Sequence, residues 1–101
     1  MIEAEIHPLA ARELDAAVEF YEEQVHGLGR RFLDAVEKSI EQILQFPEAC
    51  PVIGDTVRQK PISRFPYSLF YSLEEDRVLF VAVAHQKRKP GYWTERLRDP
   101  R

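Results

Sequence analysis

Residues 67–84, with the sequence YSLFYSLEEDRVLFVAVA, decide the fold of this 101-residue chain. From Tyr67 to Leu73, tyrosine and leucine side chains alternate with serine and phenylalanine, and alternation with period two is typical of a β-strand. Residues 78–84 form an uninterrupted apolar run of strand length, and the acidic residues 74–76 separate the two segments. Two strands joined by a short acidic turn predict an antiparallel β-hairpin.

One more strand is expected just before the hairpin. Residues 57–62 predict an edge strand, because Pro61 is tolerated only near the edge or the end of a sheet. Residues 47–55 contain two prolines and a Gly-Asp pair, which together predict a loop. The hairpin therefore extends to three strands, with a loop leading into the first of them.

Two amphipathic helices precede this loop. Apolar residues recur at helical spacing over residues 10–25 and again over residues 32–44. Pro8 suits the first turn of a helix, where its missing N–H has no intrahelical partner to lose. Gly27 and Gly29 interrupt the pattern between the two runs, so we expect an αα-hairpin.

The order of these elements defines the fold class. Residues 2–6 alternate apolar and acidic side chains and predict a short strand, which gives the order β-α-α-β-β-β. We expect a single α+β domain over residues 1–101, with the helical hairpin on one face of a small, mainly antiparallel sheet. Residues 78–84 are apolar on both faces, so either Tyr92 and Trp93 of the tail or another molecule covers the second face.

Composition excludes several classes of protein. The lone Cys50 excludes an internal disulfide and a multi-cysteine metal site. The sequence contains no Gly-rich phosphate loop and no metal-ligand spacing, so we expect no cofactor and no metal. No apolar run has the length of a membrane helix, and residues 1–5 lack the pattern of a signal peptide. We therefore expect a cytoplasmic protein with no membrane partner.

Charge is divided unevenly along the chain. Residues 1–50 contain four Lys/Arg and eleven Asp/Glu, a net charge of −7, whereas residues 51–101 contain ten and six, a net charge of +4. The basic tail, residues 85–101, has a turn predicted at residues 90–91 and one helical turn at residues 94–97. The basic half can meet a polyanion although the whole chain carries −3. Alternatively, the acidic residues simply mark the solvated faces of two helices.

His85 is the histidine best placed for chemistry. His7 and His26 lie at the two ends of the first helix, where structural or solvated roles are ordinary. His85 ends the most apolar strand and opens a basic, aromatic segment, and histidine is suited to proton transfer near neutral pH.

Basic and aromatic side chains around His85 form a candidate surface for a nucleic acid or another target. Guanidinium and ammonium groups stabilise phosphate charge, and aromatic rings offer stacking faces to unpaired bases. These candidates are Arg58, Lys60, Arg64, Lys87, Arg88, Lys89, Tyr92 and Trp93. The alternative is a charged strand edge that protects the sheet against aggregation.

Two stretches carry a family resemblance. Residues 64–71, RFPYSLFY, and residues 81–93, VAVAHQKRKPGYW, resemble the RelE/ParE toxin superfamily, in the branch of plasmid stabilisation proteins. His7-Pro8 before the first helix and residues 28–32 at the start of the second are also similar to that family. The resemblance implies the fold described above and a bacterial toxin of a type II toxin–antitoxin system, which inhibits growth until a small antitoxin protein binds it.

The resemblance implies more than one target. RelE-like members cut messenger RNA on the ribosome, and Arg64 and His85 would then be the catalytic residues. ParE-like members inhibit DNA gyrase without a nuclease site, so the target decides whether the chain is an enzyme. The long helical hairpin and the acidic net charge favour the ParE-like function. A third alternative is an inactive toxin fold that only binds the antitoxin, and a homodimer or a toxin–antitoxin hetero-oligomer stays open.

Overall fold

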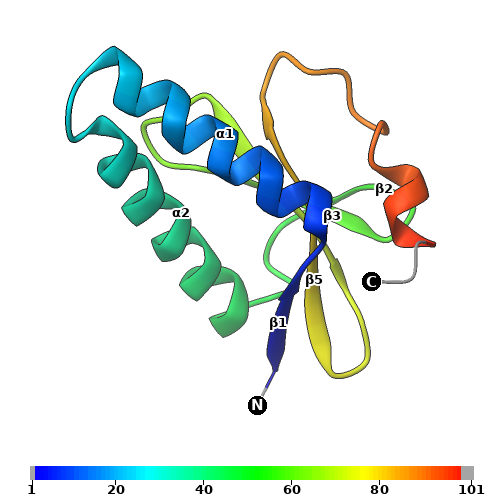
Figure 1. Cartoon of the computed structure of the whole chain (residues 1–101). Coiled ribbons are helices and arrows are strands. Elements are labelled where there is room, and N and C mark those ends of the chain that lie inside the picture. Colours follow the sequence, from blue (N-terminus) through cyan, green and yellow to red (C-terminus); the bar gives the residue numbers. More distant parts are fainter. Residues whose placement is uncertain (1, 99–101) are drawn as a thin grey trace.

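The computed structural model describes residues 2–98 and arranges two α-helices on one side of a five-stranded sheet (Figure 1). In chain order the elements are β1 (Glu3–Ile6), α1 (Pro8–Gln24), α2 (Leu28–Gln45), β2 (Val52–Gly54), β3 (Val57–Pro61), β4 (Tyr67–Leu73), β5 (Arg77–His85) and the 3₁₀-helix η1 (Thr94–Leu97). The expected α+β order is confirmed. The short strand β2, which lies inside the predicted loop, is an addition to it.

The sheet is built around the predicted hairpin. Its strand order is β1-β5-β4-β3-β2, in which β1 runs parallel to β5 and all the other neighbours are antiparallel. Strand β4 covers the residues expected for it, and its first residue, Tyr67, pairs with His85 at the end of β5. Strand β1 thus lies at one edge of the sheet, and its parallel pairing with β5 makes the sheet mainly rather than wholly antiparallel. Strand β2 forms the other edge, so β3 is not the edge strand expected for residues 57–62.

A side-chain cap marks the beginning of α1, and a glycine determines how closely α1 packs against α2. The buried His7 side chain accepts a hydrogen bond from the Leu9 N–H at 3.1 Å, which confirms a structural role for His7. A Cβ atom on Gly29 would lie 2.8 Å from the Val18 carbonyl oxygen, so the close contact between the helices requires glycine there. Neither helix in the described part of the chain is long and apolar enough to cross a membrane.

A first core fills the space between the helices and the sheet. Helix α1 packs over β5, and α2 packs mainly against α1. The buried members of this core are Ala17, Phe32, Val36, Ile43, Ile62, Leu69, Tyr71, Val78, Phe80 and Val83. Aromatic rings close one end of it, where Tyr21 packs against Phe32 and Phe65 with ring centroids 5.0 Å apart in both pairs.

The tail covers the second face of the sheet. Trp93 is only 2% exposed and lies against Phe70, with ring centroids 6.0 Å apart. The buried members of this second core are Val57, Phe70, Leu79, Val81, Ala82, Ala84 and Trp93, and Tyr92 and Leu97 pack at its margin. Of the two alternatives for this face, the tail is therefore the one that the structure adopts, and η1 forms the expected helical turn. Residues 99–101 of the predicted basic tail lie outside the described residues.

Replacing Trp93 tests how much this second core contributes to stability. We expect Trp93→Ala to lower the free energy of unfolding by about 3 kcal/mol or more, because a large buried aromatic side chain leaves a cavity. Urea unfolding followed by far-UV circular dichroism measures the change. Phe46→Ala is the matched control, because Phe46 is 64% exposed and its loss should cost less than about 0.5 kcal/mol. Equal losses for the two variants would contradict the packing of the tail.

Candidate functional site

Past the end of its pairing with β1, the edge of β5 forms hydrogen bonds with side chains instead of with another strand. The pairing of β1 with β5 ends at Ile6 and Phe80, so the following residues of β5 have no strand beside them on this edge. Glu13 of α1 accepts a hydrogen bond from the Val83 N–H at 3.0 Å, and Arg96 of η1 donates one to the Val81 carbonyl at 2.9 Å. The open edge is therefore satisfied by an acidic and a basic side chain from two different elements.

Those two side chains also bind each other and the tail. The Arg96 guanidinium donates two hydrogen bonds to the Glu13 carboxylate, at 2.9 and 3.0 Å, in a bidentate pair. The Tyr92 hydroxyl donates to the same carboxylate at 2.9 Å. Arg88 lies 3.7 Å from it and 3.5 Å above the centre of the Tyr92 ring, a cation–π contact. We name Glu13, Arg88, Tyr92 and Arg96 the tail clamp.

Burial and neighbouring groups shift the pKa values of two clamp residues, Tyr92 and Arg96. Burial, with the neighbouring Glu13 charge and hydrogen bond, raises the pKa of Tyr92 to about 12, so its hydroxyl stays a donor. Burial lowers the pKa of Arg96, but its hydrogen bonds and attraction to Glu13 outweigh that effect and raise it overall. The side chains of Arg96 and Glu13 are only 11% and 16% exposed, so this ion pair is shielded from solvent.

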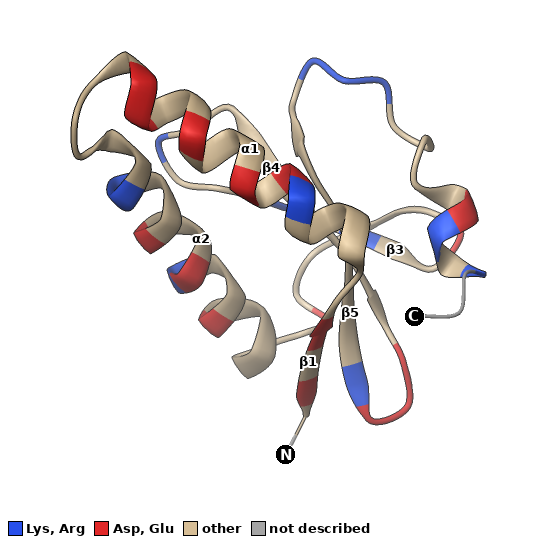
Figure 2. Cartoon of the chain, in the orientation of Figure 1, with Lys and Arg blue, Asp and Glu red and all other residues tan. Residues whose placement is uncertain are grey.

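The basic loop between β5 and Trp93 presents charge to solvent. Lys87 and Lys89 are exposed and form no ion pair with the described residues, whereas Arg88 between them turns into the clamp. Figure 2 shows this blue segment apart from the acidic helices. Of the sequence-predicted target residues in this segment, Lys87 and Lys89 therefore form no ion pair with the described residues, whereas Trp93 is buried and Tyr92 and the 53% exposed Arg88 contact Glu13.

His85 is half-buried at the start of this loop. Its Nδ1 accepts a hydrogen bond from the Lys87 N–H at 3.1 Å, and its ring packs edge-on against Tyr67 with centroids 5.3 Å apart. These two contacts tie the imidazole to the start of the loop and to the first residue of β4.

Arg58 and Lys60 share the helix-facing side of the sheet, as their spacing predicts, but they do different things. Arg58 donates to the carbonyl oxygens of Glu48 and Cys50, at 3.1 and 2.6 Å. The buried Tyr71 hydroxyl donates to the Pro47 carbonyl in the same connection at 2.8 Å. Arg58 thus fixes the chain between α2 and β2, whereas Lys60 lines a groove.

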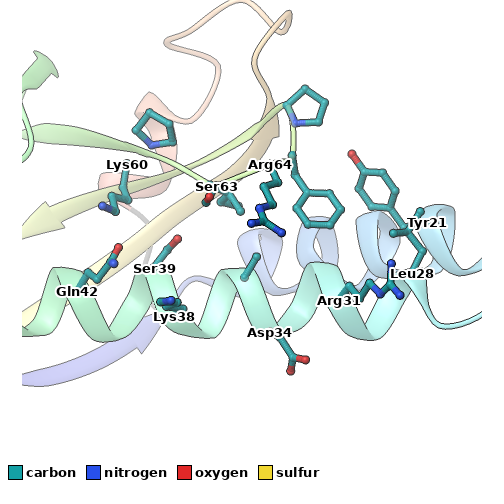
Figure 3. A pocket seen from close by; sticks show the side chains of 15 residues that line it. Tyr21, Leu28, Arg31, Asp34, Lys38, Ser39, Gln42, Lys60, Ser63 and Arg64 are labelled. Carbon is teal, nitrogen blue, oxygen red and sulfur yellow. The ribbon is translucent and has the colours of Figure 1, made fainter.

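This groove runs between α2 and the connection from β3 to β4, with a volume of about 960 Å³ (Figure 3). Four cations line it, Arg31 and Lys38 from α2 and Lys60 and Arg64 from the opposite wall. None of them forms an ion pair within residues 2–98, and the lining Asp34 pairs with Arg30 at 2.8 Å and points away from the groove. We name this feature the basic groove; its other lining residues are Tyr21, Leu28, Ala35, Ser39, Gln42, Pro61, Ile62, Ser63, Phe65 and Pro66.

Arg64 reaches the groove from a strained backbone. Its φ angle of 71° lies in the left-handed region, which side-chain-bearing residues rarely adopt. The guanidinium points toward α2 (Figure 3), and His85 is not among the residues that line the groove. The groove thus contains one of the two residues expected to act together in a nuclease.

The sequence analysis did not identify Glu13, the central residue of the tail clamp, or Arg31 and Lys38, two of the four cations that line the groove. Glu13 is one of five acidic residues of α1, and nothing in their pattern distinguishes it. Arg31 and Lys38 did carry a signal, because residues seven apart lie on the same side of a helix. Within residues 2–98 no group of three or more His, Cys, Asp or Glu side chains is arranged to hold a metal ion.

Comparisons with known proteins agree with this architecture. The family model described as the ParE toxin of the type II toxin–antitoxin system parDE matches residues 4–90. A solved structure titled "Chromosomal ParDE TA system from P. aeruginosa" has the same fold, with a TM-score of 0.64 and 20% sequence identity over 84% of this chain and 96% of that chain. No curated protein matches significantly. The family match ends before Tyr92 and Arg96, so half of the tail clamp lies beyond it.

The raised pKa of Tyr92 predicts a pH dependence of stability. A tyrosine whose pKa is about 12 in the folded chain and ~10 in the unfolded chain stabilises fully below pH 10 and loses that contribution as pH rises toward 12. We expect the wild type to lose about 1 kcal/mol more than Tyr92→Phe between pH 9 and pH 11.5, after allowance for solvent screening. Urea unfolding across this range measures it, and parallel profiles for the two proteins would contradict the assignment.

Proposed function

The chain belongs to the ParE toxin family of type II toxin–antitoxin systems, and we propose that this toxin arrests growth by inhibiting DNA gyrase. The family match covers residues 4–90, and the gyrase target is the part that we propose. Inhibition of a protein target requires a fixed contact surface and no catalytic group, and the basic loop with Lys87 and Lys89 is such a surface. We place the toxin in the cytoplasm, where gyrase acts on DNA.

The arrangement of His85 carries this proposal over RNA cleavage. Attack by an RNA 2′-hydroxyl needs a proton acceptor and a cation within hydrogen-bond reach of one point. His85 already accepts the Lys87 N–H, and Arg64 extends into a groove that His85 does not line. This arrangement supports an inhibitor over a nuclease, because the described groove holds Arg64 without His85.

We further propose that the antitoxin occupies the basic groove. The sequence left the second face of the sheet open to either the tail or a partner such as the antitoxin, and the tail covers that face. The groove combines four cations that form no ion pair within residues 2–98 with the apolar side chains of Ala35, Ile62 and Phe65, and this suits an amphipathic helix with acidic residues on one side. A specific interface of this kind buries more than about 1,000 Å² and makes the neutralised form a hetero-oligomer.

Two substitutions distinguish the targets. We expect His85→Ala to arrest growth and inhibit purified gyrase within about twofold of the wild type, because a surface contact needs no proton transfer. The double variant Lys87→Gln/Lys89→Gln should lose at least about tenfold in both assays, since it removes the free charges of the loop. A supercoiling assay and a growth assay measure these effects.

The opposite pattern would assign an RNA target. Loss of ~10²-fold or more in a folded His85→Ala variant, with loss of message cleavage on translating ribosomes, would overturn the gyrase proposal. No growth arrest by the wild-type chain when it is produced alone would indicate a fold that only binds the antitoxin.

Charge reversal tests the antitoxin site. We expect Arg31→Glu and Lys38→Glu each to weaken antitoxin binding by at least about tenfold, because each places a like charge opposite an acidic partner. Arg30→Glu is the matched control, since Arg30 lies on the same helix but outside the groove. Isothermal titration with the antitoxin encoded beside the gene gives the dissociation constants, and equal losses for the three variants would contradict this site.

A further inference from the structure

We propose that Glu13 is a positioning residue for the target contact, because it holds the tail in the one arrangement that presents Lys87 and Lys89 outward. The proposal rests on the proposed function only in taking the basic loop as the target contact. Glu13 lies on α1, 74 positions before Lys87 in the sequence. In this proposal an acidic residue therefore controls a distant basic surface.

The tail depends on side chains for its position. From Arg88 onward, the backbone hydrogen bonds that the tail donates within the described residues go to His85 or to the tail itself. No strand pairing holds residues 86–98 on the sheet. Beyond the Gln86 N–H bond to Pro66 at its start, the tail is attached by side chains, namely the buried Trp93 ring, Leu97 at the margin of the second core, and the tail clamp.

Glu13 is the point at which the clamp converges. Its carboxylate accepts from Tyr92, Arg96 and the Val83 N–H, so one side chain joins helix α1, the edge of β5 and the tail. Tyr92 and Arg96 lie on either side of Trp93 in the sequence. Their hydrogen bonds to Glu13 therefore restrain the orientation of the indole ring on the sheet. Removing the carboxylate leaves a largely buried guanidinium without its counter-ion.

The clamp also sets the direction of the lysines. The Arg88 side chain is 53% exposed, yet its guanidinium stacks on Tyr92 and lies 3.7 Å from Glu13. Its neighbours Lys87 and Lys89 are exposed on either side. Because the contact of Arg88 with Tyr92 and Glu13 ties the middle of the loop to the clamp, the two lysines lie on a restrained backbone before any target binds, and a preorganised contact loses less entropy on binding.

The test uses Trp93 as an internal reporter, because it is the only tryptophan in the chain. We expect Glu13→Gln to shift the Trp93 emission to the red and to speed hydrogen exchange of the Val83 amide. Growth-arrest potency should fall by at least about tenfold. Glu19→Gln is the matched control, an exposed carboxylate on the same helix, and should change none of these readouts. Tyr92→Phe removes one bond without stranding a charge and should give smaller shifts of the same kind.

A combined variant separates positioning from general stability. If Glu13 acts through the lysines, its replacement should matter little once the lysines are gone. Adding Glu13→Gln to the Lys87→Gln/Lys89→Gln variant should then lower growth-arrest potency by less than about twofold. The comparison is made at a dose where the lysine variant still arrests growth. A full additive loss, an unchanged Trp93 emission, or a released tail with normal potency would each overturn the proposal. Growth arrest that follows this pattern while purified gyrase is unaffected would reject the target and keep the role of Glu13.

Discussion

Strand β5 is apolar on both faces, and the rest of the structure follows from the need to cover both. The helical hairpin buries one face through α1, and a tail with almost no regular structure buries the other through Trp93. A segment without backbone pairing costs conformational entropy to order, so it needs strong and specific side-chain attachments. Glu13 supplies them from the opposite layer, at the point where β5 has no neighbouring strand, and so connects the two cores across the edge of the sheet.

The division of charge along the chain becomes a division in space. Most acidic residues of α1 and α2 are exposed, with Glu13 as the main exception, and two groups of cations form the basic groove and the basic loop (Figure 2). Arg31 and Lys38 belong to the acidic half of the sequence, yet their positions on α2 bring them opposite Lys60 and Arg64. A chain with a net charge of −3 thereby keeps two local positive surfaces, because the field near a surface depends on its nearest charges and is screened beyond about 10 Å.

The sequence was sufficient for the elements and their order, and insufficient for the contacts between their polar side chains. Alternation in residues 67–73 and the apolar run that follows predicted the hairpin, because burial imposes a period on the chain. The strand β2 was missed, because three residues between turns show no such period. Glu13 was missed for another reason. Its partners lie 70 to 83 residues away, and no local pattern records which of several acidic residues on α1 meets them.

The basic groove and the basic loop share one structural wall, and this links the two proposed contacts. Pro66 lines the groove, and its carbonyl accepts the Gln86 N–H at 2.8 Å, at the first residue of the loop. The connection from β3 to β4, which includes the strained Arg64, forms this side of the groove and continues into that hydrogen bond. A partner bound in the groove, as we propose for the antitoxin, would therefore contact the same short connection that supports the base of the loop carrying Lys87 and Lys89. The two proposed contacts are thus joined through Pro66 and Gln86, although they use different cations.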